Sequence, residues 1–422
     1  MNPEKPSTSY RRFFAQLGPG LITGAADDDP SGIATYSVTG AQFGYAPLWT
    51  ALFSFPLMVA VQLMCARLGL ITGRGLAAVV RQRYPRWVVW GACLLLVVAN
   101  TVNIGADLGG MSAAAQMVTG LPWYFWNPFF AVLLVVLLSF TSYSLMVRVL
   151  KWLTLVLFAY VFTAFVVHPD WHAVLHATLV PDLRWDSAYL SVLVGILGTS
   201  ISPYLFFWQA AQEVEEERSQ GRSTLAQRKG ATRAELTHAR NDVVAGMFFS
   251  NFVMFFIILT TAATLHAHGN SHIATARDAA EALRPLAGPG AYWLFTAGLI
   301  GTGMLGVPVL AGSSAYAISE AKAWGASLDR KPKLVPKFYA VLTVAMLVGM
   351  GLNYAHLDSV KMLFWAAVLN GVLAPPLIVL ILLLTSDPKV MGRDVNPTWL
   401  RVAGWICAAV MTLAAVAMFI AG

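Results

Sequence analysis

Three consecutive carboxylates, Asp27, Asp28 and Asp29, stand in the middle of an apolar stretch that is rich in small residues. A charge near the centre of a bilayer costs at least a few kcal/mol, so such residues inside a membrane span usually have a function. Pro30 removes a backbone donor and Gly32 loosens the backbone, so we expect the helix to unwind here. Unwound backbone at membrane depth is tolerated only where protein or a water-filled cavity covers it. Many transporters hold a cation at such a break, and the stretch therefore predicts an ion carrier.

The composition indicates an all-α polytopic membrane protein. Of the 422 residues, 57% are hydrophobic and 12% are charged, whereas about 25% are charged in an average soluble domain. The net charge of +7 does not indicate a nucleic-acid partner, because the basic residues lie in short loops between apolar runs. The three cysteines lie within apolar runs and suggest no disulfide framework. No stretch resembles a nucleophile triad, a phosphate loop or a haem motif, so we expect neither an enzyme nor a cofactor.

Apolar length predicts eleven membrane spans. They cover about residues 14–43, 47–71, 87–118, 127–143, 146–167, 187 onward, 241–266, 292–324, 336–354, 360–385 and 399–421. Residues 1–13 would form a cytoplasmic tail, residues 14–385 a transport core of ten helices, and residues 386–422 a loop and the eleventh helix.

Loop charges predict the orientation. With the N-terminus inside, all but four of the 28 Lys and Arg residues fall in cytoplasmic segments, as the positive-inside rule requires. The four exceptions are Arg184, Arg277, Arg284 and Lys361. We therefore expect an integral protein of the inner (plasma) membrane with its C-terminus outside.

The interruptions reveal an internal repeat. The sixth span breaks at about residues 200–203, in the segment GTSISPY, five spans after the break at ADDDPSG. Two broken helices at matching places predict two inverted five-helix repeats, about 14–168 and 187–385, with a binding site between the breaks. Thr199 and Ser202 at the second break would line that site with hard oxygen ligands. Alternatively, their hydroxyls satisfy their own backbone.

At the first break, Asp29 is the strongest candidate ligand, and the alternative is a carboxylate that caps the following helix. We expect Asp27 and Asp28 to point to different sides, one toward an aqueous path and the other toward a partner. Gly32 has no side chain, so it cannot coordinate an ion through one.

Further polar residues could line the path. We expect Asp107 either to face the inner vestibule or to pair with an arginine. Gln209 and Glu213 share a helix face at i and i+4 and could line the exit, although residues 213–217 more often form a solvated helix end. Asn370 faces either the site or a neighbouring helix, and helix packing is the safer expectation.

Two loops have a predicted shape. The charge pattern of residues 213–240 predicts a helix that extends out of the membrane with opposite charges along it. The polar residues 266–289 are expected to form a short outer surface helix. His266, His268 and His272 in the outer segment have only a weak metal-binding spacing, and we expect them to be solvated.

These motifs resemble the Nramp family of divalent-metal transporters, most closely its magnesium-transporting branch. The resemblance covers residues 18–385 and is carried by GPG before the first break, DP within it, GAQFGY after it, GTSISPYLFFW, GVPVLAGSSAYAISEA and LNGVLAPPL. It implies a LeuT-type fold.

The site residues depart from the usual Nramp pattern. Where the family has Asp-Pro-Gly-Asn, this chain has Asp29-Pro30-Ser31-Gly32, so the acidic ligand remains and the Asn ligand is lost. The family's methionine ligand corresponds to Ser202 and its two sixth-span histidines to Tyr204 and Gln209. The third-span Asp-x-x-Glu becomes Asp107 followed by Gly110, and the tenth-span glutamine corresponds to Ala367 or a neighbour.

These departures favour a hard cation, since thioethers prefer transition metals whereas hydroxyls and carboxylates suit Mg²⁺ or Mn²⁺. The lost histidines and glutamate also remove groups that the family uses to pass protons. We therefore expect import of hydrated Mg²⁺, or of Mn²⁺, without proton coupling. Two charges crossing 100 mV are worth about 4.6 kcal/mol, which suffices as a driving force. The expected partners are the metal ion and the lipid bilayer, with the protein a monomer.

Two alternatives stay open. One is a proton-coupled Mn²⁺/Fe²⁺ transporter, in which Asp107 and the extra aspartates replace the lost relay. The other is a LeuT-type carrier of an organic cation, held in a pocket lined by Asp29, Tyr204 and Trp208.

Overall fold

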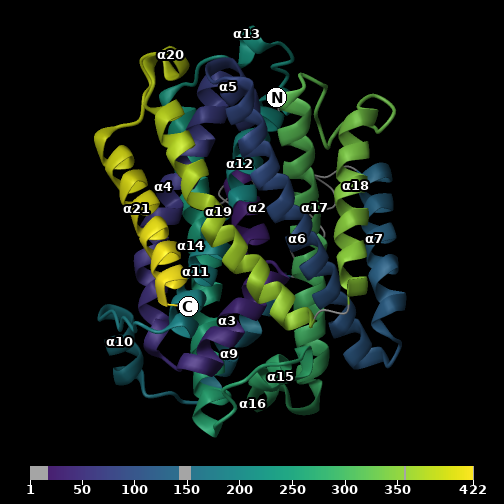
Figure 1. The fold of residues 1–422 in the computed structure, drawn as a ribbon, viewed down its shortest axis with the longest axis vertical. Helices are drawn as coiled ribbons and strands as arrows, with labels where there is room; N and C mark the ends of the chain where they lie inside the picture. The colour runs from purple at the N-terminus through teal and green to yellow at the C-terminus, as the bar shows by residue number, and fades with distance from the viewer. Residues whose placement is uncertain (1–17, 142–153, 356–357, 422) are drawn as a thin grey trace, which may run out of the picture.

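The structure, a computed structural model, describes residues 18–141, 154–355 and 358–421, and the described chain folds into helices joined by short connections (Figure 1). The first half comprises α2 (Pro19–Asp27), α3 (Pro30–Phe43), η1 (Ala46–Leu48), α4 (Trp49–Thr72), α5 (Leu76–Arg83), α6 (Arg86–Thr119), α7 (Trp123–Phe140), η2 (Thr154–Leu157), α9 (Phe158–Val166) and α10 (Trp171–Leu179). The second half comprises α11 (Ser187–Ser200), α12 (Pro203–Ser219), α13 (Leu225–Arg228), α14 (Arg233–Thr264), η3 (His266–His268), α15 (Ala276–Ala280), η4 (Glu281–Leu283), α16 (Arg284–Ala287), η5 (Gly288–Gly290), α17 (Ala291–Ala321), α18 (Pro336–Leu352), η6 (Asn353–Ala355), α19 (Ser359–Thr385), α20 (Pro388–Met391) and α21 (Thr398–Ala421).

Apart from the fifth, the predicted spans correspond to helices of the described chain, with shifted bounds: the seventh, predicted from residue 241, begins at Arg233. Nine stretches of the described chain are helical, long and apolar enough to cross a membrane. The broken pair α2 and α3 and a shorter apolar helix over residues 155–166 are present in addition to these nine. The predicted fifth span, 146–167, falls partly outside the described residues, so the count of eleven stays a prediction.

Both predicted breaks are present, and the two broken helices run in opposite directions. In Figure 1, α2 and α12 lie in the upper half of the molecule, while α3 and α11 continue below them. The half-helices meet in pairs, because α2 packs against α12 and α3 packs against α11. This arrangement brings the two breaks to the same depth at the centre of the fold.

The remaining long helices surround the breaks in two groups. The helix α14 packs against α2 and α3, and α4 packs against α12 and α14, whereas α6, α7, α17 and α18 pack against one another. The helix α19 contacts members of both groups, and α21 covers the outer side of α19, α11 and α4. The site is therefore enclosed on every side by helices rather than by loops.

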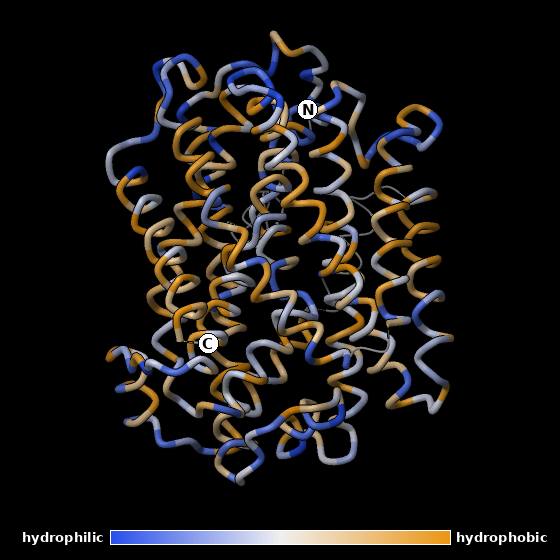
Figure 2. Tube along the Cα trace, in the orientation of Figure 1, coloured by the Kyte–Doolittle hydropathy of each residue, from blue (hydrophilic) through white to orange (hydrophobic). Residues whose placement is uncertain are grey.

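Figure 2 shows apolar residues through the middle of the bundle and hydrophilic residues at its upper and lower ends. The helix α2, with which the described chain begins, lies in the upper half of the molecule, and α21 finishes toward the lower end, where α10, α15 and α16 lie (Figure 1). Hydrophilic residues at both ends of an apolar bundle fit a membrane protein. Which face is cytoplasmic stays a prediction from the loop charges.

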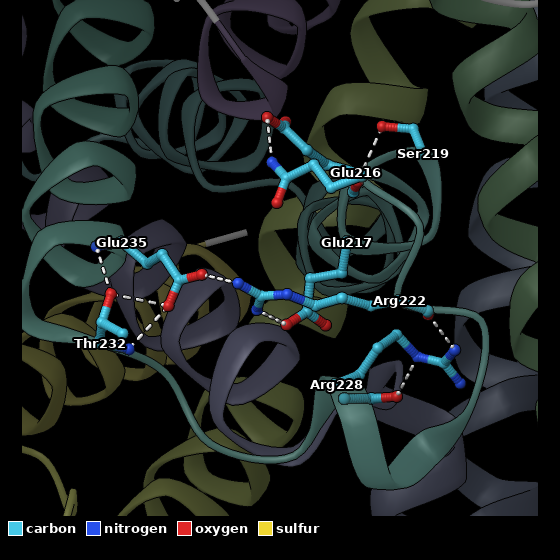
Figure 3. A network of polar contacts seen from close by, with 9 residues as sticks. Glu216, Glu217, Ser219, Arg222, Arg228, Thr232 and Glu235 are labelled. Atoms are coloured by element: carbon cyan, nitrogen blue, oxygen red, sulfur yellow. Dashed lines mark hydrogen bonds and ion pairs between the residues drawn. The ribbon is translucent and has the colours of Figure 1, made fainter.

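The connection from α12 to α14 corrects one prediction. Residues 213–240 do not form a single projecting helix, because α12 ends at Ser219 and α14 begins at Arg233. The opposite charges pair across the turn instead: Arg222 forms ion pairs with Glu217 and Glu235 (Figure 3). Glu235 also completes the N-terminal cap of α14. The outer segment 266–289 likewise folds into several short helical pieces rather than one.

The tightest contact of the first broken helix is with α14. A Cβ atom on Gly24 would lie 2.2 Å from the carbonyl oxygen of Gly246, and one on Gly246 would lie 2.1 Å from that of Gly20. Neither position has space for a methyl group, so α2 and α14 touch backbone to backbone. In addition, the Asp242 carboxylate of α14 accepts hydrogen bonds from the N–H groups of Gly18 and Gly20, which begin α2. Together these contacts fix the position of α2 against α14.

We predict that Gly246→Ala lowers stability, because the added methyl must push α2 away from α14. Overpacking of this kind costs about 1–3 kcal/mol. Gly91→Ala on α6 is the matched control, since the space beside Gly91 is open and alanine is favoured over glycine in a helix. Thermal unfolding in detergent should show a lower Tm for Gly246→Ala and an unchanged or higher one for Gly91→Ala. Equal Tm values for the two variants would contradict the contact.

Candidate functional site: the two helix breaks

The first break consists of two residues. The helix α2 ends at Asp27, Asp28 leaves helical geometry with φ −83° and ψ 52°, and Asp29 is extended with φ −72° and ψ 172°. Pro30 then begins α3, where its missing N–H is harmless and its fixed φ suits the first helical position. The predicted unwinding is confirmed at Asp28 and Asp29, whereas Gly32, which was expected to loosen the backbone, lies within α3.

Asp29 both caps α3 and faces the other broken helix. Its Oδ1 accepts hydrogen bonds from the Ser31 hydroxyl (2.6 Å) and from the N–H of Gly32 (2.9 Å). Its Oδ2 lies 3.2 Å from the hydroxyl of Tyr204 on α12, which is also 3.0 Å from the carbonyl oxygen of Ala26. The capping alternative therefore holds, and the carboxylate still points toward the gap between the breaks. No described Lys or Arg forms a salt bridge with it.

The second break lies between Ser200, where α11 ends, and Pro203, where α12 begins. The Ser202 hydroxyl lies 2.6 Å from the carbonyl oxygens of both Gly198 and Thr199. The Ser202 hydroxyl therefore bonds to the backbone of its own helix, which is the predicted alternative to a ligand role.

The Thr199 hydroxyl is engaged in the same way. It lies 2.9 Å from the carbonyl oxygen of Ile196 and 3.0 Å from the hydroxyl of Tyr36 on α3. A hydroxyl that donates to a carbonyl keeps its two lone pairs, so Thr199 and Ser202 retain the ability to bind a cation.

Asp27 and Asp28 do not point to different sides as expected. Both side chains reach Ser250 of α14, whose hydroxyl lies 2.5 Å from Asp27 Oδ2 and 3.3 Å from Asp28 Oδ1. The prediction was wrong because it assumed a continuing helix, whereas the chain leaves helical geometry at Asp28 and turns both carboxylates toward α14. The partner is a serine and not a base. A polar Ser-Asn pair within the otherwise apolar seventh span was the available signal for Ser250.

Asp107 of α6 is fully buried, and neither of its carboxylate oxygens accepts a hydrogen bond from another described residue. It lies beside the first break: a Cβ atom on Gly306 of α17 would be 3.7 Å from Asp107 Oδ2 and 2.9 Å from Asp29 Cβ. Of the two expectations for Asp107, pairing with an arginine is not found among the described residues. Sequence reasoning missed Gly306, whose lack of a side chain leaves room for Asp29 Cβ to approach α17.

The breaks thus gather four buried carboxylates without a basic partner in the described chain. Asp27, Asp28, Asp29 and Asp107 are each at most 4% exposed. A buried charge without compensation is costly, so the arrangement calls for a cation or for protons. No three side chains of His, Cys, Asp or Glu in the described ranges already sit as a ready metal cluster. A cation here would consequently be held by one or two carboxylates, helped by hydroxyls, carbonyls and water.

A polar column continues from the first break toward the upper end of the molecule. The hydroxyl of Thr23 donates to Gln209 Oε1 (2.6 Å), and Gln209 Nε2 donates to Glu213 Oε1 (2.8 Å). The predicted shared face of Gln209 and Glu213 is confirmed. The expectation of a solvated helix end at 213–217 was wrong, because Glu213, Glu215 and Glu217 are all buried.

Glu213 opens into a cavity of about 260 Å³, which we call the acidic pocket. Its ionisable lining residues are Glu213, Glu216, Glu217, Glu235, His238 and Asp242. Figure 3 shows Glu216 and Glu217 near the Arg222 ion pairs that close the α12–α14 turn. The acidic pocket lies at the end where the chain begins, which is the predicted cytoplasmic face.

Asn370 is part of the helix packing, as expected. Its Oδ1 accepts a hydrogen bond from Asn103 Nδ2 at 3.0 Å, and its own Nδ2 lies 3.3 Å from Asn103 Oδ1. The two amides tie α19 to α6 in the interior of the bundle.

Comparison with known proteins identifies relatives along almost the whole chain. Residues 20–421 match the profile of the family described as Nramp, "natural resistance-associated macrophage protein-like". The divalent metal cation transporter MntH of Deinococcus radiodurans is 29% identical over 419 residues, which cover 95% of this chain and 88% of the relative.

Two solved structures show the fold. The manganese transporter of Eremococcus coleocola, in complex with an aromatic bis-isothiourea substituted compound, matches with a TM-score of 0.76 and 20% identity over 98% of this chain and 88% of that one. Mhp1, a nucleobase-cation-symport-1 family transporter, matches with a TM-score of 0.59 and 15% identity over 100% and 96%. These likenesses confirm the expected LeuT-type fold.

We predict that Asp29→Asn lowers metal uptake more than about tenfold, equivalent to about 1.4 kcal/mol. Asparagine preserves the shape of the side chain and still caps a helix, so the loss would reflect the missing charge. Asp186→Asn is the matched control, because Asp186 caps α11 in the same way at its far end. Radiotracer uptake into proteoliposomes should fall for Asp29→Asn but not for Asp186→Asn. An equal fall for both variants would show that Asp29 acts only as a helix cap.

Proposed function

The chain belongs to the Nramp family, and on that premise we propose that it imports a hard divalent metal ion through the two helix breaks. Support comes first from the four buried carboxylates that lack a basic partner among the described residues. A doubly charged cation compensates part of that charge, whereas a neutral substrate would leave it uncompensated.

The donor atoms support a hard ion. Asp29 and Asp107 offer carboxylates, Ser202 and Thr199 offer hydroxyls, and the breaks free backbone carbonyls, all of which suit Mg²⁺ and Mn²⁺. Mg²⁺ keeps several waters and binds through one or two carboxylates, which fits a site with few direct ligands. Serine at the position of the family's methionine favours this hydrated mode. We infer that Mg²⁺ passes with part of its water shell.

The relatives favour Mn²⁺ as a substrate. The Deinococcus protein is named a divalent metal cation transporter and the Eremococcus structure is that of a manganese transporter. Because Mn²⁺ is also bound well by oxygen ligands, we propose that the same site carries both ions.

We further propose that the ion leaves along the polar column. From Asp29 it would pass Gln209 and Glu213, which are hydrogen-bonded to each other, and enter the acidic pocket. The carboxylates there attract a cation that has left the breaks. Tyr204, which bridges Asp29 and the carbonyl of Ala26 in this conformation, would have to release Asp29 first.

A proton-coupled Mn²⁺/Fe²⁺ transporter is the second candidate, and two observations favour it. Asp107 is buried without a hydrogen-bond partner in the described chain and could carry a proton. The thioether of Met254 lies 3.5 Å from the Ser200 hydroxyl beside the second break, within reach of a softer ion.

Uptake in proteoliposomes that contain a pH dye distinguishes these candidates. We predict uptake of both Mg²⁺ and Mn²⁺, driven by an inside-negative potential, without internal acidification. Acidification that follows metal entry and disappears in Asp107→Asn would select the proton-coupled candidate instead. Calorimetric binding of an organic amine in the absence of divalent binding would select the organic-cation alternative and contradict metal transport.

A further inference from the structure

A second cavity lies at the opposite end of the molecule from the acidic pocket. It has a volume of about 720 Å³ and lies between α10, the end of α3 and the segment η3 that follows α14. We call it the outer pocket, because the loop charges predict that this end faces outward. Its lining includes His172, His176, His266 and Asp182, together with Phe43 and Gly44 at the end of α3.

Two of the histidines lie on one face of a capped helix. His172 and His176 line the pocket together with Ala173, Ala177 and Val180, which is the pattern of a single helical face. Residues at i and i+4 have Cβ atoms about 5–6 Å apart, so their imidazoles can bind one metal ion together. Asp170 caps this helix through the N–H groups of residues 172 and 173. Within the described ranges, neither imidazole makes a hydrogen bond.

The third histidine is already oriented as a metal ligand. His266 Nδ1 lies 2.9 Å from the carbonyl oxygen of Ala41, and since a carbonyl can only accept, Nδ1 must carry the hydrogen. In the corresponding tautomer of the imidazole, Nε2 is the nitrogen that offers a lone pair to a metal ion. Metal-binding histidines are commonly oriented by such a bond to a backbone carbonyl. The same ring packs against Gly44, where a Cβ atom would be 2.9 Å from His266 Cδ2.

From these contacts we infer that the outer pocket binds a borderline transition-metal ion such as Zn²⁺ and that the bound ion slows transport. The pair His172 and His176 takes the ion first, with water as further ligands, because no three such side chains in the described chain meet at one point. His266 joins through Nε2 as α10 and η3 approach. Imidazole suits Zn²⁺, Cu²⁺ and Ni²⁺ but not Mg²⁺, so this site selects against the ion expected at the breaks.

The position of the outer pocket, next to the end of α3, accounts for how a bound ion would slow transport. The outer pocket adjoins Gly44, the residue that follows α3, and α3 is the half-helix whose other end is capped by Asp29. An ion that links α10 to η3 around this end would hold α3 in one position. Because alternating access moves one group of helices against the other, a fixed α3 would retard it. The inhibitory role rests on the proposed transport function, whereas the binding site itself does not.

Zn²⁺ binding to the full-length protein in detergent tests the site without any transport assay. Equilibrium dialysis with ZnCl₂ and excess Mg²⁺ should show a bound ion whose affinity falls more than about tenfold in His172→Ala/His176→Ala and falls also in His266→Ala. The double variant His268→Ala/His272→Ala is the matched control, since neither residue lines the outer pocket. Asp29→Asn should bind this ion as the wild type does. Equal Zn²⁺ affinity in the wild type and in His172→Ala/His176→Ala would overturn the site.

The inhibitory role is tested separately, by external Zn²⁺ during Mn²⁺ uptake, with each variant compared with its own rate in the absence of Zn²⁺. We expect inhibition in the wild type and in the control variant, and more than about tenfold weaker sensitivity in His172→Ala/His176→Ala. Unaltered sensitivity in that variant would overturn the inhibitory role even where binding is lost.

Discussion

The cost of burying carboxylates without a basic partner is the constraint on which this structure depends. Asp27, Asp28, Asp29 and Asp107 lie inside a helical bundle. The described residues supply hydroxyls and N–H groups to the first three, but no ammonium or guanidinium to any of the four. Hydrogen bonds from Ser31, Gly32 and Tyr204 stabilise part of the charge at Asp29. They do not neutralise it, and a mobile cation is the simplest complement.

The rest of the fold serves to hold the two breaks in place. The α2 helix is clamped between the carboxylate of Asp242 at its start and the close contact with Gly246 along its length. Gly306 of α17 lets Asp29 pack closely against that helix, since a Cβ atom there would lie 2.9 Å from Asp29 Cβ. A strained or unwound backbone persists only when its surroundings determine it, and here rigid helices on all sides do so.

The sequence was sufficient to locate the breaks because their cause is local. Proline and glycine act on the backbone wherever they stand, so α3 begins at Pro30 and α12 at Pro203, as expected. The directions of side chains could not be obtained in this way. Asp28 turns toward Ser250 because of how α14 packs, and Glu217 is buried because the chain folds back through Arg222. Both depend on contacts between residues far apart or across a turn, for which spacing along a helix gives no information. The i, i+4 spacing of the histidine pair of α10 can be read from the sequence. That the pair faces a pocket shared with the end of α3 and with His266 can be seen only in the structure.

The central claim is that a divalent cation sits between the breaks and is bound by Asp29. Its most direct test is an anomalous difference map from crystals of the protein soaked in Mn²⁺. The account predicts a peak between the two breaks, either in direct contact with the Asp29 carboxylate or one water molecule away from it, with Tyr204 displaced. A map with no peak there, in which Asp29 still contacts only Ser31, Gly32 and Tyr204 at saturating Mn²⁺, would contradict it.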